Sequence, residues 1–200
     1  MSTSNGHWTE SDVFKAPNLI TIARLILSVA VFALIDFNQI PWATAVFILA
    51  ASTDWIDGYV ARKYDMVTVL GRILDPFVDK IIVCGTFIYL VKVSGSGVHA
   101  WMVVTIVGRE MLVTALRGWL EQQGADFSAS QWGKLKMVLQ CVAIPLCLLC
   151  ALFISLEQLP PAWLHWTRVA VLWSAIASTV ISGLIYIREA VRLTGAAQEK

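Results

Sequence analysis

The chain has 200 residues, of which 58% are hydrophobic and 14% are charged, and its formal net charge is +1. Soluble domains carry about 25% charged residues. The composition therefore excludes an ordinary soluble domain, because a chain this short cannot bury so much apolar surface, and it indicates lipid as the surrounding solvent. A net charge this close to zero gives no support for a nucleic-acid partner.

The first 16 residues are mainly polar, with Trp8 and Phe14 interleaved among them. The absence of an early apolar run and of a small-residue cleavage site is not typical of a signal peptide. We interpret residues 1–16 as a cytosolic N-terminal segment, which either lies along the membrane interface or forms a disordered tail.

Six apolar runs follow, and each is close to the about 20 residues that a helix needs to cross a bilayer. They do not alternate between apolar and polar residues as barrel strands do. The predicted spans cover residues 19–37, 41–61, 73–91, 98–120, 135–156 and 163–187. The predicted fold is all-α: a polytopic membrane protein with six transmembrane helices in one domain, residues 17–192, followed by a cytosolic tail, residues 193–200.

Turn-forming residues and charges separate these runs. Asn38 and Pro41 follow the first run, and Pro160 and Pro161 precede the last. Lysine and arginine are absent from residues 36–41, 94–100 and 155–161, whereas they are frequent at the opposite ends of the runs. Cytosolic loops carry an excess of these two residue types. Both termini are therefore predicted to face the cytosol.

Four aspartates flank the loop between the second and third runs. Asp54 and Asp57 are three residues apart near the end of one predicted helix, and Asp75 and Asp79 are four apart at the start of the next. Each pair therefore shares one helix face. Carboxylates near the membrane edge are costly unless they face a wet cavity and are compensated. Divalent cations provide that compensation, and Mg²⁺ or Mn²⁺ suits phosphate chemistry.

An alternative is that these acids form ordinary interfacial ion pairs. The candidate partners are Arg62, Lys63, Arg72 and Lys80. The joint spacing of the four acids, with Gly58 and Gly71 among them, favours the metal site. A glycine destabilises a helix by about 1 kcal/mol relative to alanine, so its presence suggests a ligand close to the backbone, although Gly71 also fits a turn.

Together these residues form the pattern Asp54-x2-Asp57-Gly58-x2-Ala61-Arg62-x8-Gly71-x3-Asp75-x3-Asp79. The pattern resembles the signature of the CDP-alcohol phosphotransferase family, and all eight of its fixed positions are filled. The six-span layout is similar as well, so the resemblance covers nearly the whole chain.

This resemblance implies a role for each signature residue. The residues expected to hold the metal, two ions of Mg²⁺ or Mn²⁺, are Asp54, Asp57, Asp75 and Asp79. Asp79 is also expected to act as the general base on the acceptor hydroxyl. The residues expected to bind the CDP-linked lipid are Gly58, Ala61, Arg62 and Gly71. The family further implies a homodimer in the bacterial inner membrane, with its active site facing the cytosol.

A second polar cluster lies at the predicted cytosolic ends of the fourth and fifth spans. Its basic members are Arg109, Arg117, Lys134 and Lys136. Arg109 falls within an apolar run, so its charge needs a partner or an anionic ligand. These cations either extend along apolar surface to the interface, or they bind the phosphate of an acceptor.

Three short segments of this cluster resemble the phosphatidylglycerophosphate synthase branch of the family, and so does a segment around the start of the first span. The segments of the cluster are residues 109–110, 116–117 and 133–136, and the earlier one is residues 17–24. Met137 stands where this branch is expected to have a threonine. The resemblance implies transfer of a phosphatidyl group from CDP-diacylglycerol to sn-glycerol 3-phosphate, which gives phosphatidylglycerol phosphate and CMP. Alternatives are a cardiolipin synthase that uses phosphatidylglycerol, a synthase of inositol or serine lipids, and, in another class, a cation-binding transporter.

Overall fold

The computed structural model describes residues 16–64, 69–122 and 131–198, and the side chains of residues 21–53, 77–120 and 133–192. Within these residues the chain forms six α-helices and no strand, which confirms the predicted all-α fold. The helices are α2 (Ala16–Asp36), α3 (Ile40–Tyr64), α4 (Val69–Leu90), α5 (Ala100–Gln122), α6 (Gln131–Ser155) and α7 (Ala162–Gln198). Each lies within a few residues of a predicted run, except that α7 continues well past Ile187.

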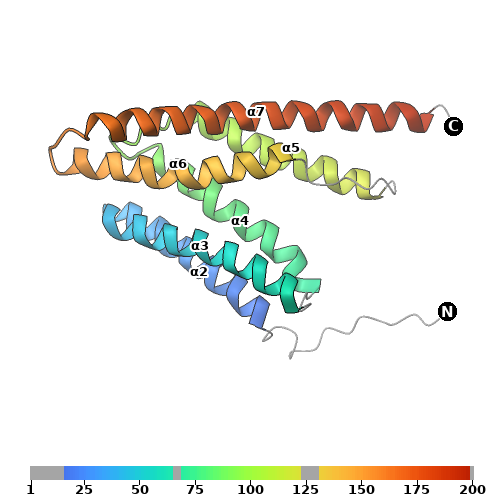
Figure 1. Ribbon diagram of the computed structural model, residues 1–200, viewed down its shortest axis with the longest axis horizontal. Helices are drawn as coiled ribbons and strands as arrows, with labels where there is room; N and C mark the ends of the chain where they lie inside the picture. Colours follow the sequence, from blue (N-terminus) through green and yellow to red (C-terminus); the bar gives the residue numbers. More distant parts are fainter. Residues whose placement is uncertain (1–15, 65–68, 123–130, 199–200) are drawn as a thin grey trace.

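Consecutive helices run in opposite directions along the long axis of the molecule (Figure 1). At one end, α2, α4 and α6 begin and α3, α5 and α7 finish; we call this the site end. The opposite end, which we call the loop end, carries the connections α2–α3, α4–α5 and α6–α7. The signature aspartates lie on helix segments at the site end, because they belong to the end of α3 and the start of α4.

Two helices stop at the loop end in the same way. Asn38 and Glu157 have φ angles of 57° and 55°. After α2, the N–H of Gln39 donates to the carbonyl of Leu34 at 2.7 Å, and after α6 the N–H of Gln158 donates to Phe153 at 2.9 Å. In each case a residue with left-handed backbone geometry is followed by a hydrogen bond to the carbonyl five residues earlier in the chain. This arrangement satisfies carbonyls that have no partner within the last turn of a helix. The predicted break at Asn38 is confirmed.

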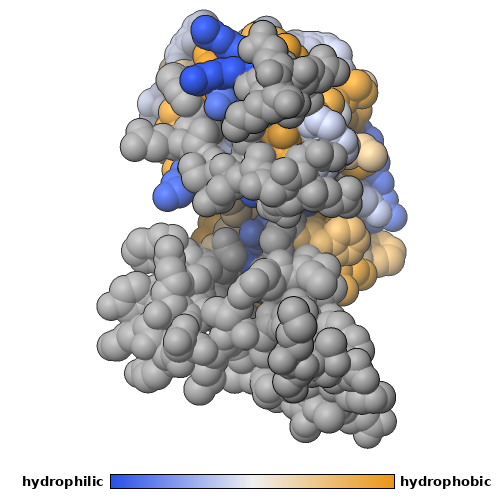
Figure 2. Space-filling model, turned by 90° about the vertical axis from the view of Figure 1, so that its right-hand side faces the viewer, coloured by the Kyte–Doolittle hydropathy of each residue, from blue (hydrophilic) through white to orange (hydrophobic). Residues whose placement is uncertain are grey.

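The hydrophobic core lies toward the loop end. Its largest fully buried members include Phe47 in the first half of α3, Phe87 in the last turns of α4, and Ile144 and Leu148 in the second half of α6. These helix halves pack closely, whereas α2, α3 and α4 diverge from α5, α6 and α7 toward the site end (Figure 1). Figure 2 views the site end, where described hydrophilic and hydrophobic residues both reach the surface.

The described surface is strongly apolar. Two helical segments, Gly133–Ser155 and Ala162–Arg192, are long and apolar enough to cross a bilayer, and Ile40–Thr53 is apolar but shorter. Within each segment an apolar stretch of 18 residues is less than half buried, 39% and 44%, so much of its apolar surface faces outward. Exposed apolar surface of this extent indicates contact with lipid or with another protein.

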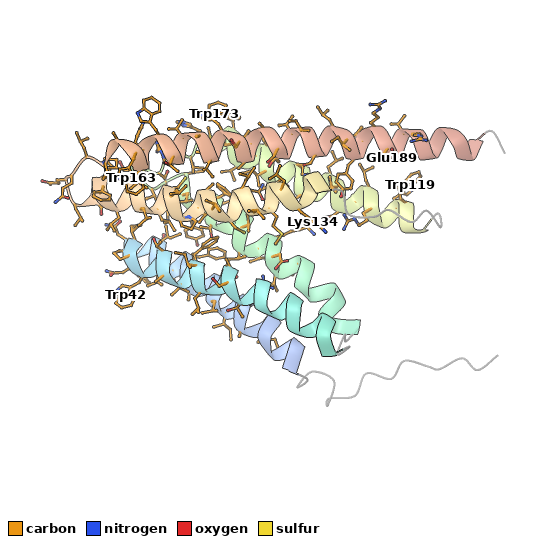
Figure 3. All side chains as sticks on the ribbon, in the orientation of Figure 1. Trp42, Trp119, Lys134, Trp163, Trp173 and Glu189 are labelled. Carbon is orange, nitrogen blue, oxygen red and sulfur yellow. The ribbon has the colours of Figure 1, made fainter. Side chains whose placement is uncertain are left out.

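Tryptophans gather at the loop end. Trp42, Trp163 and Trp166 are each at least 65% exposed, and Figure 3 shows Trp42 and Trp163 beside the loops. The rings of Trp101 and Trp173 lie 5.7 Å apart, and both side chains are about half exposed. Tryptophan is enriched where a membrane protein meets the interface between lipid and water. The loop end therefore has the side-chain chemistry of a membrane interface.

Candidate active site

The structure places all eight signature residues on two consecutive helices at the site end. Those on α3 are Asp54, Asp57, Gly58, Ala61 and Arg62, and those on α4 are Gly71, Asp75 and Asp79. Of these eight side chains, only that of Asp79 falls within the described part of the molecule. The predicted metal and nucleotide sets therefore stay predictions.

Asp79 forms an ion pair with Arg24, which joins α4 to α2 across 55 positions of sequence. Arg24 is only 4% exposed, and Asp79 is half-buried. A charge pair taken out of water needs such a direct contact, because desolvation of either member alone is costly. The sequence does not predict this pair, because its two members lie on different helices; the available signal is an arginine within an apolar run, whose charge needs a partner.

Two of the predicted acceptor-binding residues, Arg109 on α5 and Lys136 on α6, are buried, with 8% and 7% of their surfaces exposed. The carboxylate of Glu110 contacts both of them. Its Oε1 atom lies 3.1 Å from Nη1 of Arg109 and also forms an ion pair with Nζ of Lys136. One carboxylate therefore connects α5 to α6 and brings two predicted site residues together.

Two residues of α7 contact Arg109 and Arg117, the two arginines of the predicted acceptor site. The ring of Tyr186 lies 5.3 Å from the guanidinium carbon of Arg109 and 5.9 Å from that of Arg117. Nη2 of Arg117 donates to the Tyr186 hydroxyl at 3.2 Å, and Nε of Arg109 donates to the Ser182 hydroxyl at 3.1 Å. Sequence reasoning missed Tyr186 and Ser182, because an aromatic and a small polar residue in an apolar run are ordinary helix content.

One donor of the half-buried Arg117 has no partner in the described part of the molecule. Its Nε atom is buried and has no hydrogen-bond partner among the described residues. A buried donor without a partner carries a free-energy penalty of about 1–3 kcal/mol. A bound anionic oxygen would remove that penalty, but Nε of Arg168, near the loop end of α7, has the same property, so the feature does not by itself locate a ligand.

The remaining cations near this cluster differ in exposure. Lys134 is exposed at the site end of α6 (Figure 3), and no described hydrogen bond or ion pair involves it. Lys80, which follows Asp79 on α4, is half-buried and lies near enough to Arg109 and Arg117 for their charges to act on it. The structure thus brings three of the four predicted acceptor residues together, and it adds Lys80 beside them.

The donor chemistry of the signature fits a divalent metal ion, since aspartate carboxylates supply the oxygen ligands that Mg²⁺ and Mn²⁺ prefer. Among the described side chains, no group of three or more acidic, histidine or cysteine residues could hold such an ion. Three of the four signature aspartates lie outside those side chains, so the described residues neither complete nor contradict the set.

Comparison with known proteins identifies the family to which the chain is similar. Residues 14–181 match the family model described as CDP-alcohol phosphatidyltransferase. A CDP-diacylglycerol–glycerol-3-phosphate 3-phosphatidyltransferase from Bacillus subtilis (strain 168) is 36% identical, over 87% of this chain and 94% of its own length.

Two further relatives carry the same name. The protein from Pseudomonas fluorescens is 33% identical over 87% of this chain and 89% of its own length. The protein from Escherichia coli (strain K12) is 33% identical over 88% of this chain and 95% of its own length. These matches confirm the resemblance that rested on the aspartate signature. The chain belongs to the CDP-alcohol phosphatidyltransferase family.

Proposed function

We propose that this protein is a phosphatidylglycerophosphate synthase. It transfers the phosphatidyl group of CDP-diacylglycerol to sn-glycerol 3-phosphate, and the products are phosphatidylglycerol phosphate and CMP. The observation that carries the choice of acceptor is the cluster of Arg109, Arg117 and Lys136, which is buried or half-buried at the same end of the molecule as the signature aspartates. The names of the relatives from Bacillus subtilis and Escherichia coli support the same acceptor.

On the donor side, Asp54, Asp57, Asp75 and Asp79 hold two Mg²⁺ or Mn²⁺ ions. When bound, the ions neutralise the pyrophosphate and the departing CMP. Gly58, Ala61 and Gly71 allow the nucleotide to approach the backbone of α3 and α4, and Arg62 binds the pyrophosphate. These assignments rest on the signature pattern in the sequence.

On the acceptor side, Asp79 takes the proton from the attacking hydroxyl of glycerol 3-phosphate. The hydroxyl oxygen then forms a bond to the lipid-side phosphorus, and the bond from that phosphorus to the CMP oxygen breaks. Arg109, Arg117, Lys134 and Lys136 bind the acceptor's own phosphate, because guanidinium and ammonium groups donate charge-assisted hydrogen bonds to phosphate oxygens. This division of labour needs the two clusters to lie near each other, and the helix segments that carry them lie at the same end of the molecule, which supports it (Figure 1).

In the membrane, the six helices each cross the bilayer, with the site end and both termini in the cytosol. Residues 1–16 form the cytosolic or interfacial N-terminal segment, residues 17–192 the transmembrane domain, and residues 193–200 the cytosolic tail. The exposed tryptophans at the loop end support this placement, since they suit the opposite interface. The protein acts as a homodimer in the bacterial inner membrane.

An acceptor screen tests the proposal. Purified protein, CDP-diacylglycerol and Mg²⁺ are incubated separately with glycerol 3-phosphate, phosphatidylglycerol, inositol, serine and glycerol, and CMP release is measured. We expect rapid release with glycerol 3-phosphate alone. Faster release with phosphatidylglycerol would identify a cardiolipin synthase, and faster release with inositol or serine would identify another branch of the family. No release with any alcohol would favour a non-enzymatic role, such as cation transport.

A further inference from the structure

We propose that Glu110 is a positioning residue of the acceptor site: its carboxylate holds Arg109 and Lys136 together so that their remaining N–H groups face one phosphate group. This inference rests on the proposed function and deepens it. The carboxylate is an unexpected element of an anion site, because a negative charge repels phosphate. Its position between two buried cations gives it a different task.

Burial makes a counter-charge necessary at this position. The side chains of Arg109, Lys136 and Glu110 are 8%, 9% and 13% exposed. Two like charges this deeply buried repel each other, and each is costly to desolvate without an opposite charge nearby. The charges of Lys80 and Arg117 add to this repulsion, since both lie close to the cluster. Glu110 offsets part of it and connects α5 to α6.

The contacts around Arg109 also fix its direction. Glu110 holds Nη1, Ser182 accepts from Nε, and Tyr186 lies against the guanidinium. A Cβ atom at Gly183 would lie only 3.2 Å from Cγ of Arg109, so α7 approaches the arginine stem closely. A side chain held on three sides loses little further conformational entropy when a ligand binds, which is how preorganisation improves affinity.

Enough donors remain for a phosphate while Glu110 stays in place. A guanidinium has five N–H donors and an ammonium has three. The described contacts of Arg109 engage Nε and Nη1, and those of Lys136 engage Glu110 alone. Arg117 adds its buried Nε, which has no partner among the described residues. The acceptor phosphate therefore has donors from both α5 and α6 without displacing the carboxylate.

The test uses Glu110→Gln, which removes the charge and keeps the side-chain size. Purified full-length enzyme with CDP-diacylglycerol and Mg²⁺ is assayed for CMP release as glycerol 3-phosphate is varied. We expect KM for glycerol 3-phosphate to rise about 10-fold, the loss of one charge-assisted contact. KM for CDP-diacylglycerol and the slow rate with free glycerol should stay unchanged, because neither involves the acceptor phosphate.

The matched control is Glu189→Gln. Glu189 is a partly exposed carboxylate on α7 whose described partner is Arg192, three residues away. This variant should keep the KM of the wild type for both substrates. Binding of glycerol 3-phosphate is also measured in the absence of turnover, as the rise in Tm that this ligand produces. The Glu110→Gln variant should need about 10-fold more ligand for the same rise.

Three results would overturn the inference. An unchanged KM for glycerol 3-phosphate would remove any positioning role, and a lower KM would show that the carboxylate competes with the phosphate. An equal loss of rate with glycerol 3-phosphate and with glycerol would show a merely structural role. If the wild type itself does not turn over glycerol 3-phosphate, the proposed function fails; if it does and Glu110→Gln matches it, only this inference fails.

Discussion

Arg24 on α2 and Asp79 on α4 form an ion pair at the site end of the molecule. The pair connects the carboxylate proposed as general base to α2, a helix that carries none of the eight signature residues. Within α2, the Ser28 hydroxyl donates to the carbonyl of Arg24 at 2.7 Å. Helix α2 therefore contacts the proposed general base, Asp79, through the guanidinium of Arg24.

Replacement of Arg24 by methionine should destabilise the protein and lower its activity. The change leaves the Asp79 carboxylate half-buried without this counter-charge, and loss of one member of a buried pair lowers the unfolding free energy by about 3–5 kcal/mol. Arg24→Lys keeps the charge and should retain more of both properties. Thermal unfolding in detergent and CMP release measure the two effects.

A second ion pair provides the control. It joins the last residue of α2 to the segment that directly follows α4. Lys92 pairs with Asp36 at the loop end, and both side chains are more than half exposed. Exposed pairs contribute about 0–1 kcal/mol, so Lys92→Gln should change Tm and activity little. Equal effects of the Arg24 and Lys92 substitutions would contradict a special role for the Arg24–Asp79 pair.

The aspartates should separate into two roles when metal is varied. Activity should vanish with a chelator and return with Mg²⁺ or Mn²⁺. Asp57→Asn should raise the Mg²⁺ concentration needed for half-maximal rate, whereas Asp79→Asn should lower the rate at saturating Mg²⁺ by about 10²–10⁴-fold, the usual effect of a lost general base. A near-normal rate for Asp79→Asn, with metal and both substrates saturating, would contradict the base assignment.

The acceptor residues should differ in their effects, following their burial. Arg109→Ala and Lys136→Ala should each raise KM for glycerol 3-phosphate by about 10- to 150-fold, because each removes a charge-assisted contact of about 1.5–3 kcal/mol. Lys134→Ala should have the smallest effect, since Lys134 is exposed. Arg62→Ala should instead raise KM for CDP-diacylglycerol. If none of the acceptor variants changes KM for glycerol 3-phosphate, the phosphate is bound elsewhere.

Topology can be read from single cysteines in an otherwise cysteine-free chain. Gln158 is exposed in the α6–α7 connection, and Arg192 is exposed near the site end of α7. In intact cells, an impermeant thiol reagent should label Gln158→Cys and leave Arg192→Cys unlabelled. The reverse pattern would invert the proposed orientation.

Most of the fold could be predicted because apolar run length determines where helices form in lipid. The last predicted span, residues 163–187, covers only part of α7, which continues to Gln198; hydropathy falls after Ile187, but no proline follows there to end the helix. A fall in hydropathy limits a predicted span and does not by itself end a helix.

The candidate site could be predicted only in part, for a physical reason. Local spacing places Asp54 and Asp57 on one helix face, but it says nothing about partners on distant helices. Arg24 and Asp79 are 55 positions apart, and Arg109 and Ser182 are 73 apart. Their contacts depend on how the helices pack, so charge burial indicates that a partner exists without identifying it.

One competition experiment tests the account most directly. Purified protein with CDP-diacylglycerol and Mg²⁺ is incubated with equal concentrations of glycerol 3-phosphate, inositol and serine and with dispersed phosphatidylglycerol. The lipid products are then identified by mass spectrometry. We expect one new lipid, phosphatidylglycerol phosphate, which carries a terminal phosphomonoester besides its phosphodiester, and we expect Arg109→Ala to lose this product at low glycerol 3-phosphate. A new lipid that has phosphodiesters but no phosphomonoester, such as cardiolipin or phosphatidylserine, would contradict the proposed acceptor.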